Sequence, residues 1–374
     1  MLHVKSDLSV RYGALWNGCS ASLAGSGILQ IKHGKIFAVQ AENSTRPDLD
    51  LTDLTVMPAL LDCHLHLTLP DSEKEHLAER VNNLLAAGIA TVREAGSKNP
   101  VEFFFPPLRV VSTGQGISRV NHYGSNLGVP VHTVAEAEKM IDRLASCGVA
   151  QIKVIASGIF SFTEYGRIGP APFDRNELTA LVRRARLHGL PVMAHASGDE
   201  EIRRCLEAGV HSIEHGYFVS KPTLQLMAQS EIFWVPTLAP VAAWLETETQ
   251  APPLDHKQRD VVRRSLAKHM EMVALGASEG VKIAAGTDAG APGVPHGPSL
   301  LRELELLREC GLPAVDVLRS ATAVAASVCG VASVRGEIAP GKEGCLLAVC
   351  GNPLEDLSVL RNIRQLIVPE FSGR

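Results

Sequence analysis

The amino-acid sequence predicts an α/β protein in which a (β/α)8 TIM-like barrel carries a small β-sandwich domain. Between about residues 56 and 330, short apolar, β-branched runs alternate with longer amphipathic stretches, which is the pattern of βαβ units around a parallel sheet. Eight such pairs need roughly the 250 residues typical of a closed barrel, whereas an open doubly wound sheet normally has fewer strands. Residues 1–57 and 333–374 instead contain short strands with turn signals. We expect these two segments to form the small β domain and residues 58–332 to form the barrel.

Each expected barrel strand is a short apolar run, and the stretches between the runs have helical periodicity. In chain order the strands are residues 55–63, 89–93, 108–113, 151–156, 191–196, 212–215, 233–238 and 282–287. The clearest helices are residues 73–87, 135–147, 175–188 and 255–279. Residues 158–173 form the longest loop in the first half of the barrel, and long loops after strands usually act as lids or specificity elements.

Composition and charge exclude several classes of protein. The 36 Lys and Arg residues against 40 Asp and Glu give a net charge of −4, so no excess positive charge exists to bind nucleic acid. No segment approaches the roughly 18 apolar residues of a membrane span, and residues 1–10 carry charges where a signal peptide needs an apolar core. The eight cysteines show no C-x-x-C pair. We expect a cytoplasmic protein with buried free thiols and no membrane partner.

Polar residues at the ends of the expected strands are the first candidates for chemistry. His64 and His66 lie two apart at the end of the first strand, so both imidazoles share one face of it and can reach one metal ion. His195 and His215 end the fifth and sixth strands, and Asp288 follows the eighth. Such groups are costly at a barrel mouth unless they are ligated or hydrogen-bonded. The pattern therefore predicts a metal site there.

Lys153 lies inside the apolar run of residues 151–156, where a charged ammonium is unfavourable. One explanation is a buried ion pair with Glu94 or Glu214. The other is a neutral amine that reacts with carbon dioxide to give a carbamate, whose two oxygens can bridge two cations.

Several motifs occur in a fixed order along nearly the whole chain. They are MPALLDCHLHL at residues 57–67, GIATVRE at 88–94, IKVIASG at 152–158, MAHA at 193–196, SIEHG at 212–216, VKIAAGTDAG at 281–290 and PGK at 340–342. In these motifs the chain resembles the amidohydrolase superfamily, specifically its carboxylated-lysine, dinuclear-metal branch of prolidase-like dipeptidases and metallo-carboxypeptidases. Ala59 replaces the usual glycine of the first motif, Glu94 stands where aspartate is common, and residues 344–349 lack an aspartate often found there. None of these departures changes an expected ligand.

The resemblance implies a ligand set and a cofactor. His64, His66 and Asp288 would hold the more buried cation, His195 and His215 the second, and carboxylated Lys153 would bridge them. Zinc suits such nitrogen and oxygen ligands, and manganese, iron or cobalt would fit as well. Two ions about 3.5–4 Å apart would bind a bridging water and bring its pKa toward about 7. We expect the resulting hydroxide to be the nucleophile and Asp288 to be the catalytic residue that passes its proton to the leaving group.

The same resemblance indicates a reaction class. Ring-deaminating relatives commonly use one metal and a glutamate three residues after the fifth-strand histidine, where this chain has Gly198. We therefore expect cleavage of an amide bond in a small dipeptide or N-acyl amino acid. A lactonase, phosphotriesterase or carbamate hydrolase with the same centre is the alternative within enzymes. A non-catalytic barrel kept for binding is the alternative outside them, although such proteins usually lose ligands and this chain has all six.

Residues of the expected mouth loops are candidates for substrate binding. His122 and Tyr123 follow the third strand, Tyr217 follows the sixth-strand histidine, and His296 lies in the loop after the eighth strand. Arg167, with Tyr165 on the long fourth loop, could pair with a substrate carboxylate, although a solvated surface position is the favoured explanation. The expected partner is a small-molecule or short-peptide substrate. The resemblance also implies a homo-oligomer, with no feature that fixes its number of subunits.

Overall fold

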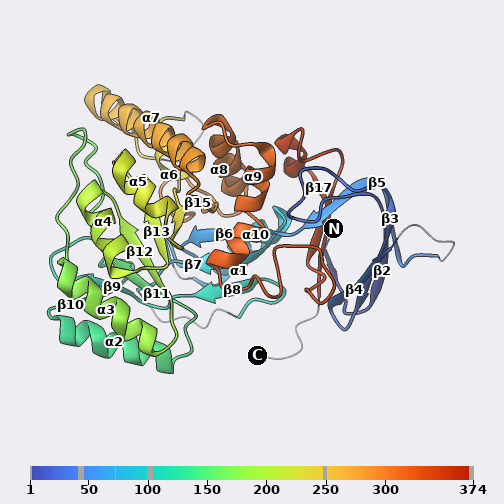
Figure 1. The fold of residues 1–374 in the computed structure, drawn as a ribbon, viewed down its shortest axis with the longest axis horizontal. Coiled ribbons are helices and arrows are strands. Elements are labelled where there is room, and N and C mark those ends of the chain that lie inside the picture. The colour runs from blue at the N-terminus through green and yellow to red at the C-terminus, as the bar shows by residue number, and fades with distance from the viewer. Residues whose placement is uncertain (1, 41–45, 72, 99–103, 247–250, 370–374) are drawn as a thin grey trace.

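The protein consists of an α/β body and a separate sheet built from both ends of the chain. The computed structural model describes residues 2–40, 46–71, 73–98, 104–246 and 251–369. Figure 1 shows the sheet that contains β2 to β5 on one side of the molecule and the helix-covered parallel strands on the other.

The terminal segments form one seven-stranded mixed sheet with the order β1-β17-β16-β5-β2-β3-β4. Alternating apolar residues of its strands, among them Val10, Leu29 and Ile36, are buried together in a core of their own. Its strands are β1 (Leu2–Val4), β2 (Leu8–Leu15), β3 (Gly27–Lys32), β4 (Lys35–Gln40), β5 (Leu49–Pro58), β16 (Leu346–Val349) and β17 (Ile363–Val368).

Ten parallel strands form the body in the described part of the chain. A three-stranded sheet contains β6 (Leu60–Leu65), β7 (Ile89–Glu94) and β8 (Arg109–Ser112). A seven-stranded sheet has the order β10-β9-β11-β12-β13-β14-β15, with β9 (Gly116–Arg119), β10 (Gly128–Val131), β11 (Ile152–Ile155), β12 (Val192–Ala196), β13 (Ser212–His215), β14 (Phe233–Val235) and β15 (Lys282–Ile283). Every described pairing in both sheets is parallel.

Backbone hydrogen bonds connect the two parallel sheets along both of their edges. Cys63 N donates to Ala285 O over 3.0 Å, which joins β6 to the segment after β15. Ala150 N donates to Ser112 O over 2.9 Å, which joins the segment before β11 to β8. The carboxyl ends of all these parallel strands therefore lie at one end of the body.

The expected strands occur, with corrections to their extents. The run of residues 55–63 is divided at Ala59, because residues up to Pro58 pair with β16 while β6 begins at Leu60. The run of residues 233–238 ends as a strand at Val235, and Thr237 has a positive φ of 47° that no strand accommodates. β9 and β10 were not expected. They lie so close together that a Cβ on Gly128 would collide with the carbonyl oxygen of Gly116.

Helices cover the parallel strands (Figure 1). The four helices expected from periodicity are present with ends that differ by one residue at most, and α3 and α7 begin at capping boxes formed by Asp174 with Glu177 and Asp255 with Gln258. The helices are α1 (Lys74–Ala86), α2 (Val134–Ser146), α3 (Arg175–Leu187), α4 (Asp199–Ala208), α5 (Lys221–Ala228), α6 (Ala239–Ala243), α7 (His256–Glu279), α8 (Pro298–Glu309), α9 (Ala314–Ser320) and α10 (Ala323–Val328), with the 3-10 helix η1 at Leu357–Arg361. Within the described ranges, no helix is both long enough and apolar enough to cross a membrane.

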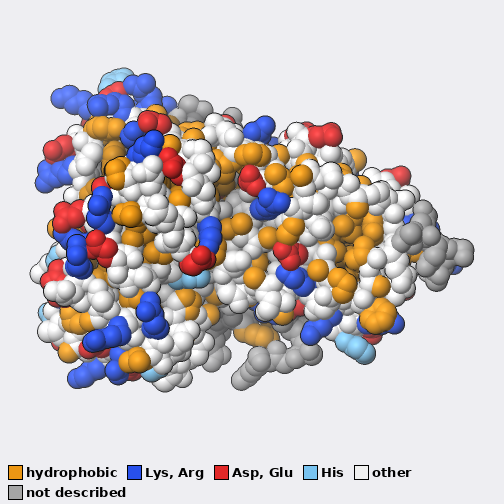
Figure 2. All heavy atoms as spheres, in the orientation of Figure 1, with side chains coloured by type: hydrophobic (Ala, Val, Ile, Leu, Met, Phe, Trp, Pro, Cys, Tyr) orange, Lys and Arg blue, Asp and Glu red, His pale blue; other side chains and the backbone are white. Residues whose placement is uncertain are grey.

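Surface charge and cysteines follow the sequence in part. On the face drawn in Figure 2, acidic and basic side chains are interspersed, and many form ion pairs such as Arg204 with Glu200 on α4.

All eight cysteines are free, as expected. The expectation that they are buried is wrong for Cys147 and Cys350, which are exposed, because one caps the end of α2 and the other follows β16 into a turn.

Candidate metal centre

Six residues expected as ligands come from the carboxyl ends of the parallel strands. His64 lies in β6, Lys153 in β11, His195 in β12 and His215 at the end of β13. His66 directly follows β6, and Asp288 lies in the segment after β15, where its N–H donates to the carbonyl of His64. The imidazole of His64 has its centroid 4.9 Å from that of His215 and 5.5 Å from that of His66. His195 and His215 are 4.5 Å apart by the same measure. The structure thus brings the histidines into one cluster.

Asp288 faces two of these imidazoles. Its Oδ1 lies 3.3 Å from His66 Nε2 and 3.5 Å from His64 Nε2. His64, His215 and Asp288 each offer one possible ligand atom, and these three atoms all lie within 4.8 Å of one another. Both His215 and Asp288 have positive φ, 68° and 53°. Left-handed backbone at non-glycine residues is uncommon, and it concentrates at functional sites where the surrounding structure imposes it.

In three of the histidines, the Nδ1 atom donates a hydrogen bond to a neighbouring group. His66 Nδ1 donates to the carbonyl of Gly96 over 2.9 Å, and His64 Nδ1 donates to Glu214 over 2.7 Å. His215 Nδ1 donates over 2.7 Å to the hydroxyl of Thr237, which in turn donates to the carbonyl of Pro236. Burial holds the pKa of His64 and of His215 well below the usual value, so these imidazoles are neutral.

This tautomer leaves the Nε2 lone pairs of His64 and His66 pointing at a carboxylate oxygen of Asp288. Two acceptors facing each other without a proton repel, and a divalent cation between them removes that repulsion. His64 Nε2 and His195 Nε2 are also buried without a hydrogen-bond partner among the described residues. The donor set therefore fits metal ions that prefer nitrogen and oxygen ligands.

Lys153 is fully buried beside this cluster. Its Nζ has no hydrogen-bond partner within the described part of the chain, so the alternative of a hydrogen-bonded pair with Glu94 or Glu214 is not found. Burial, opposed by the nearby carboxylates, lowers the pKa of Lys153 to about 8. The neutral amine, which is the state that reacts with carbon dioxide, is therefore more populated near neutral pH than for an ordinary lysine.

The carboxylate of Glu214 is used by a different cation. Arg93 Nη2 donates to both oxygens of Glu214, over 2.8 and 2.9 Å, and both side chains are fully buried. Arg93 also donates to Ser212 Oγ over 2.9 Å. These bonds hold the Glu214 carboxylate in the position where it accepts the hydrogen bond from His64 Nδ1. Sequence analysis considered Glu214 only as a possible partner of Lys153 and assigned no role to Arg93, although each is a charged residue inside an apolar strand.

The four expected substrate-binding residues take different positions. The ring of Tyr123 lies 5.0 Å from that of His195 and is partly exposed to solvent. Tyr217 is buried, stacks on His269 at 3.8 Å, and has a hydroxyl without a hydrogen-bond partner among the described residues. His296 donates from Nε2 to the backbone carbonyl of His66 over 3.1 Å. His122 instead donates to the carbonyl of Val120. Tyr123 and His296 therefore contact expected ligands, and Tyr217 follows His215 by two residues.

Two cavities flank this end of the body. One of about 810 Å3 is lined by residues of the loops that follow His66 and Asp288, including Pro70 and Ala291, and by Ala243 of α6. The other, of about 400 Å3, is lined by residues of the loop after β11 and by Trp244 at the end of α6. Arg167, on that loop, is exposed and pairs with Glu164 over 2.7 Å.

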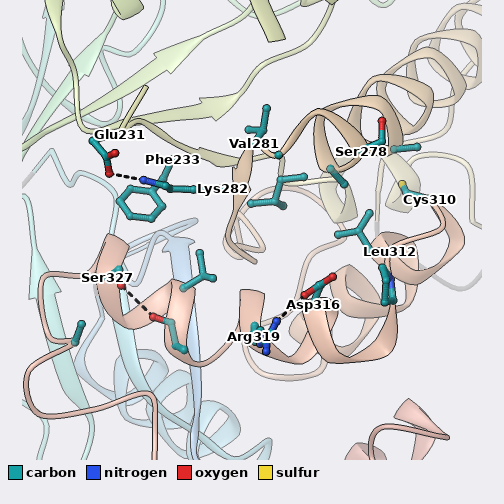
Figure 3. Close-up of a pocket in the computed structure, with 18 of the residues that line it drawn as sticks. Glu231, Phe233, Ser278, Val281, Lys282, Cys310, Leu312, Asp316, Arg319 and Ser327 are labelled. Carbon is teal, nitrogen blue, oxygen red and sulfur yellow. Dashed lines mark hydrogen bonds and ion pairs between the residues drawn. The ribbon is translucent and has the colours of Figure 1, made fainter. Parts of the chain in front are cut away.

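A larger cavity of about 960 Å3 lies at the opposite end of the strands, because it is lined by Phe233 and Lys282, the first residues of β14 and β15 (Figure 3). Its charged side chains are paired with one another, as Lys282 with Glu231 and Arg319 with Asp316. This cavity contains none of the six expected ligands. The six expected ligands therefore lie away from this cavity, at the carboxyl end of the strands.

Comparisons with known proteins give consistent similarities. The profile of the amidohydrolase family matches residues 55–373. A solved Xaa-Pro dipeptidase with methionine bound in its active site is similar with a TM-score of 0.83 and 26% identity, over 96% of this chain and 98% of that one. Ochratoxinase of Aspergillus niger is 27% identical over 290 residues, 75% of this chain and only 57% of that relative. Imidazolonepropionase of Yersinia pestis is 25% identical over 263 residues, 57% of this chain and 62% of that relative.

Proposed function

The chain belongs to the amidohydrolase family, and on that premise we propose that it is a metal-dependent hydrolase of an amide bond in a small dipeptide or N-acyl amino acid. The observation that carries the proposal is the pair of imidazole Nε2 atoms, from His64 and His66, within 3.5 Å of one carboxylate oxygen of Asp288. The similarity to a Xaa-Pro dipeptidase across 96% of the chain supports the choice of substrate.

We propose the finer architecture as well. The connections between the two parallel sheets at both ends support one closed (β/α)8 barrel over residues 58–332. The terminal sheet and its own core support a small β-sandwich domain over residues 1–57 and 333–374. A barrel directs the carboxyl ends of all its strands to one mouth, where its active site lies.

In the proposed site two divalent cations, zinc by preference, are held at the cluster. His64, His66 and Asp288 would hold one cation, His195 and His215 the other, and a carbamate on Lys153 would bridge them. The cations, when bound, lower the pKa of water and polarise the carbonyl of the scissile bond. The neutral histidines and the unpartnered Lys153 nitrogen support these assignments.

The residues of the chain would divide the remaining work. Asp288 accepts the proton of the attacking water at its carboxylate and returns it to the leaving amine. Glu214, the Gly96 carbonyl and Thr237 hold three imidazoles in the tautomer that keeps each Nε2 available. The hydroxyl groups of Tyr123 and Tyr217 would donate to oxygen atoms of the substrate, a role supported by the contact of Tyr123 with His195 and by the unpartnered hydroxyl of Tyr217 among the described residues. His122 and His296 remain proposed at the rim.

Position 198 supports hydrolysis over ring deamination. Gly198 directly precedes α4, has a φ of 91°, and its N–H donates to the carbonyl of Tyr217. It offers no side chain to shuttle protons, as a deaminating relative would need there.

Amino-acid release from a library of dipeptides and N-acyl amino acids tests the proposed function. The zinc-loaded protein, prepared with bicarbonate, should release amino acids from a subset of the library, and Lys153→Ala should release none. No release from any member, with two metal ions still bound per chain, would contradict the peptidase proposal and direct the search to lactones, carbamates or phosphoesters, which the same centre could hydrolyse.

Glu214→Gln should weaken metal binding without removing a ligand. The amide keeps the shape of the side chain but loses the charge that pairs with Arg93 and accepts the His64 proton. Loss of such an outer partner typically lowers metal affinity by about 10–100-fold, which competition with a fluorescent chelator measures. Glu231→Gln, an exposed carboxylate at the opposite end, is the matched control. Equal metal affinity for both variants would remove Glu214 from the site.

A further inference from the structure

The loop after β11 rises as a hairpin over residues 158–169. Gly158 N donates to Gly169 O over 3.2 Å, Gly169 N to Ile159 O over 3.0 Å, and Ser161 N to Arg167 O over 2.8 Å. Its two arms are so close at the base that a Cβ on Gly158 would lie 2.6 Å from Gly169 Cα. The pairing and the two glycines make this loop a defined structural element at the mouth.

One face of hairpin 158–169 is aromatic. The period of two along its first arm places Phe160 and Phe162 on the same face, and their rings stack with centroids 5.2 Å apart. Trp244, at the end of α6, packs against Phe162 edge to face at 5.1 Å. Phe160 is buried, whereas Phe162 and Trp244 are half-buried, so their rings still have surface to offer a ligand.

These rings line the open cavity of about 400 Å3 described above. Its other lining residues are Ile159, Ser161, Arg167 and Gly169. A phenyl or indole group fits such a volume, and three aromatic walls favour edge-to-face and stacked contacts with it. Arg167 is paired with Glu164, so the charge at the rim is neutralised and the cavity is apolar in character.

The aromatic cavity adjoins the candidate metal centre through two contacts. Phe160 stacks on Tyr217 at 4.7 Å, and Tyr217 follows the expected ligand His215 by two residues. His195 makes a hydrogen bond to the backbone of Gly158, the first residue of the hairpin. Phe160 therefore lines the aromatic cavity and also contacts Tyr217 next to the candidate metal centre.

We propose that this cavity is a substrate subsite for a bulky apolar group, so that the enzyme prefers substrates with a phenyl or indole side chain beside the scissile bond. The inference rests on the proposed function and extends it to a substrate class. Removing a side chain of this size from water into an aromatic pocket corresponds to a preference of about 10- to 100-fold in kcat/KM over an alanine analogue.

The first test compares hydrolysis of Phe-Ala and Ala-Phe with that of Ala-Ala. For the wild-type protein, at least one aromatic dipeptide should exceed Ala-Ala by about 10- to 100-fold in kcat/KM. Phe162→Ala should bring this ratio toward one, and Phe162→Leu should keep part of it. Leu187→Ala, which changes an exposed residue at the end of α3, should leave the ratio at the wild-type value. A ratio near one in the wild type, or an unchanged ratio in Phe162→Ala, would overturn the proposal.

The second test measures binding without turnover. Trp244 lines the cavity, so 3-phenylpropionate should change the tryptophan emission of the protein at concentrations where propionate has no effect, and Trp244→Phe should abolish that change. If no peptide is hydrolysed but the emission change is present, the proposed function fails and the apolar subsite stands. If peptides are hydrolysed but the aromatic acid gives no Trp244 signal, the subsite proposal fails and the function stands.

Discussion

Replacing Asp288 by asparagine should lower kcat by about 100- to 10,000-fold, the usual contribution of a positioned general base, while the protein keeps its metal. Asparagine retains an oxygen that can face His64 and His66, but it cannot accept a proton from the attacking water. Asp288 is held by its backbone, since its N–H donates to the carbonyl of His64 over 2.6 Å and its φ is 53°. The substitution should therefore leave the local geometry intact.

The measurement is steady-state hydrolysis of the best library substrate together with metal analysis of the same preparation. KM should change far less than kcat, because the lost interaction belongs to proton transfer. Asp316→Asn, a carboxylate of the cavity at the opposite end, is the matched control and should retain wild-type kcat. Near-full activity of Asp288→Asn with metal bound would remove Asp288 from proton transfer.

Lys153→Met should abolish turnover and reduce metal binding by more than the roughly 10–100-fold that loss of an outer partner costs. Methionine has a similar length but cannot form the carbamate. The metal-free variant should unfold at an equal or higher denaturant concentration than the metal-free wild type, because it removes a buried amine without a partner. Loss of function without loss of stability would separate the proposed ligand role from a structural one.

The pH dependence of metal loading gives a second readout for Lys153. Carbon dioxide adds to the neutral amine, forms an N–C bond and releases one proton. Because the pKa of Lys153 is lowered to about 8, reconstitution of metal-free protein at a constant concentration of dissolved carbon dioxide should accelerate as the pH rises toward about 8 and level off above it. Reconstitution that needs no bicarbonate at any pH, measured by recovered activity and by metal content, would contradict the carbamate.

Much of the architecture could be predicted because the ligand-bearing motifs lie at strand ends. His64, His195 and His215 follow apolar runs that can only be buried strands, and parallel strands direct their ends to one edge. What failed was strand extent. Ala59 sits where the chain passes from one sheet to another, and no local property of residues 55–63 marks that transition.

Other features depended on contacts between distant residues. Arg93 and Glu214 are 121 positions apart, and their role in positioning His64 is visible only from the hydrogen bonds between them. The aromatic cavity needs Phe162 on one loop and Trp244 on another. β9 and β10 are four residues each and contain Gly116 and Gly128, which disfavour strands locally. Tertiary packing, rather than propensity, decides these elements.

The pairing of β5 with β16 has a consequence for synthesis of the chain. Val56 lies opposite Ala348, so the N-terminal strands emerge from the ribosome roughly 300 residues before their partner. At the 5–20 residues per second of translation, this interval lasts roughly 15–60 s. During that time β5 has an unpaired edge, which is the kind of surface that recruits other chains. The terminal sheet should therefore be the last part to fold and the part that most needs chaperone protection.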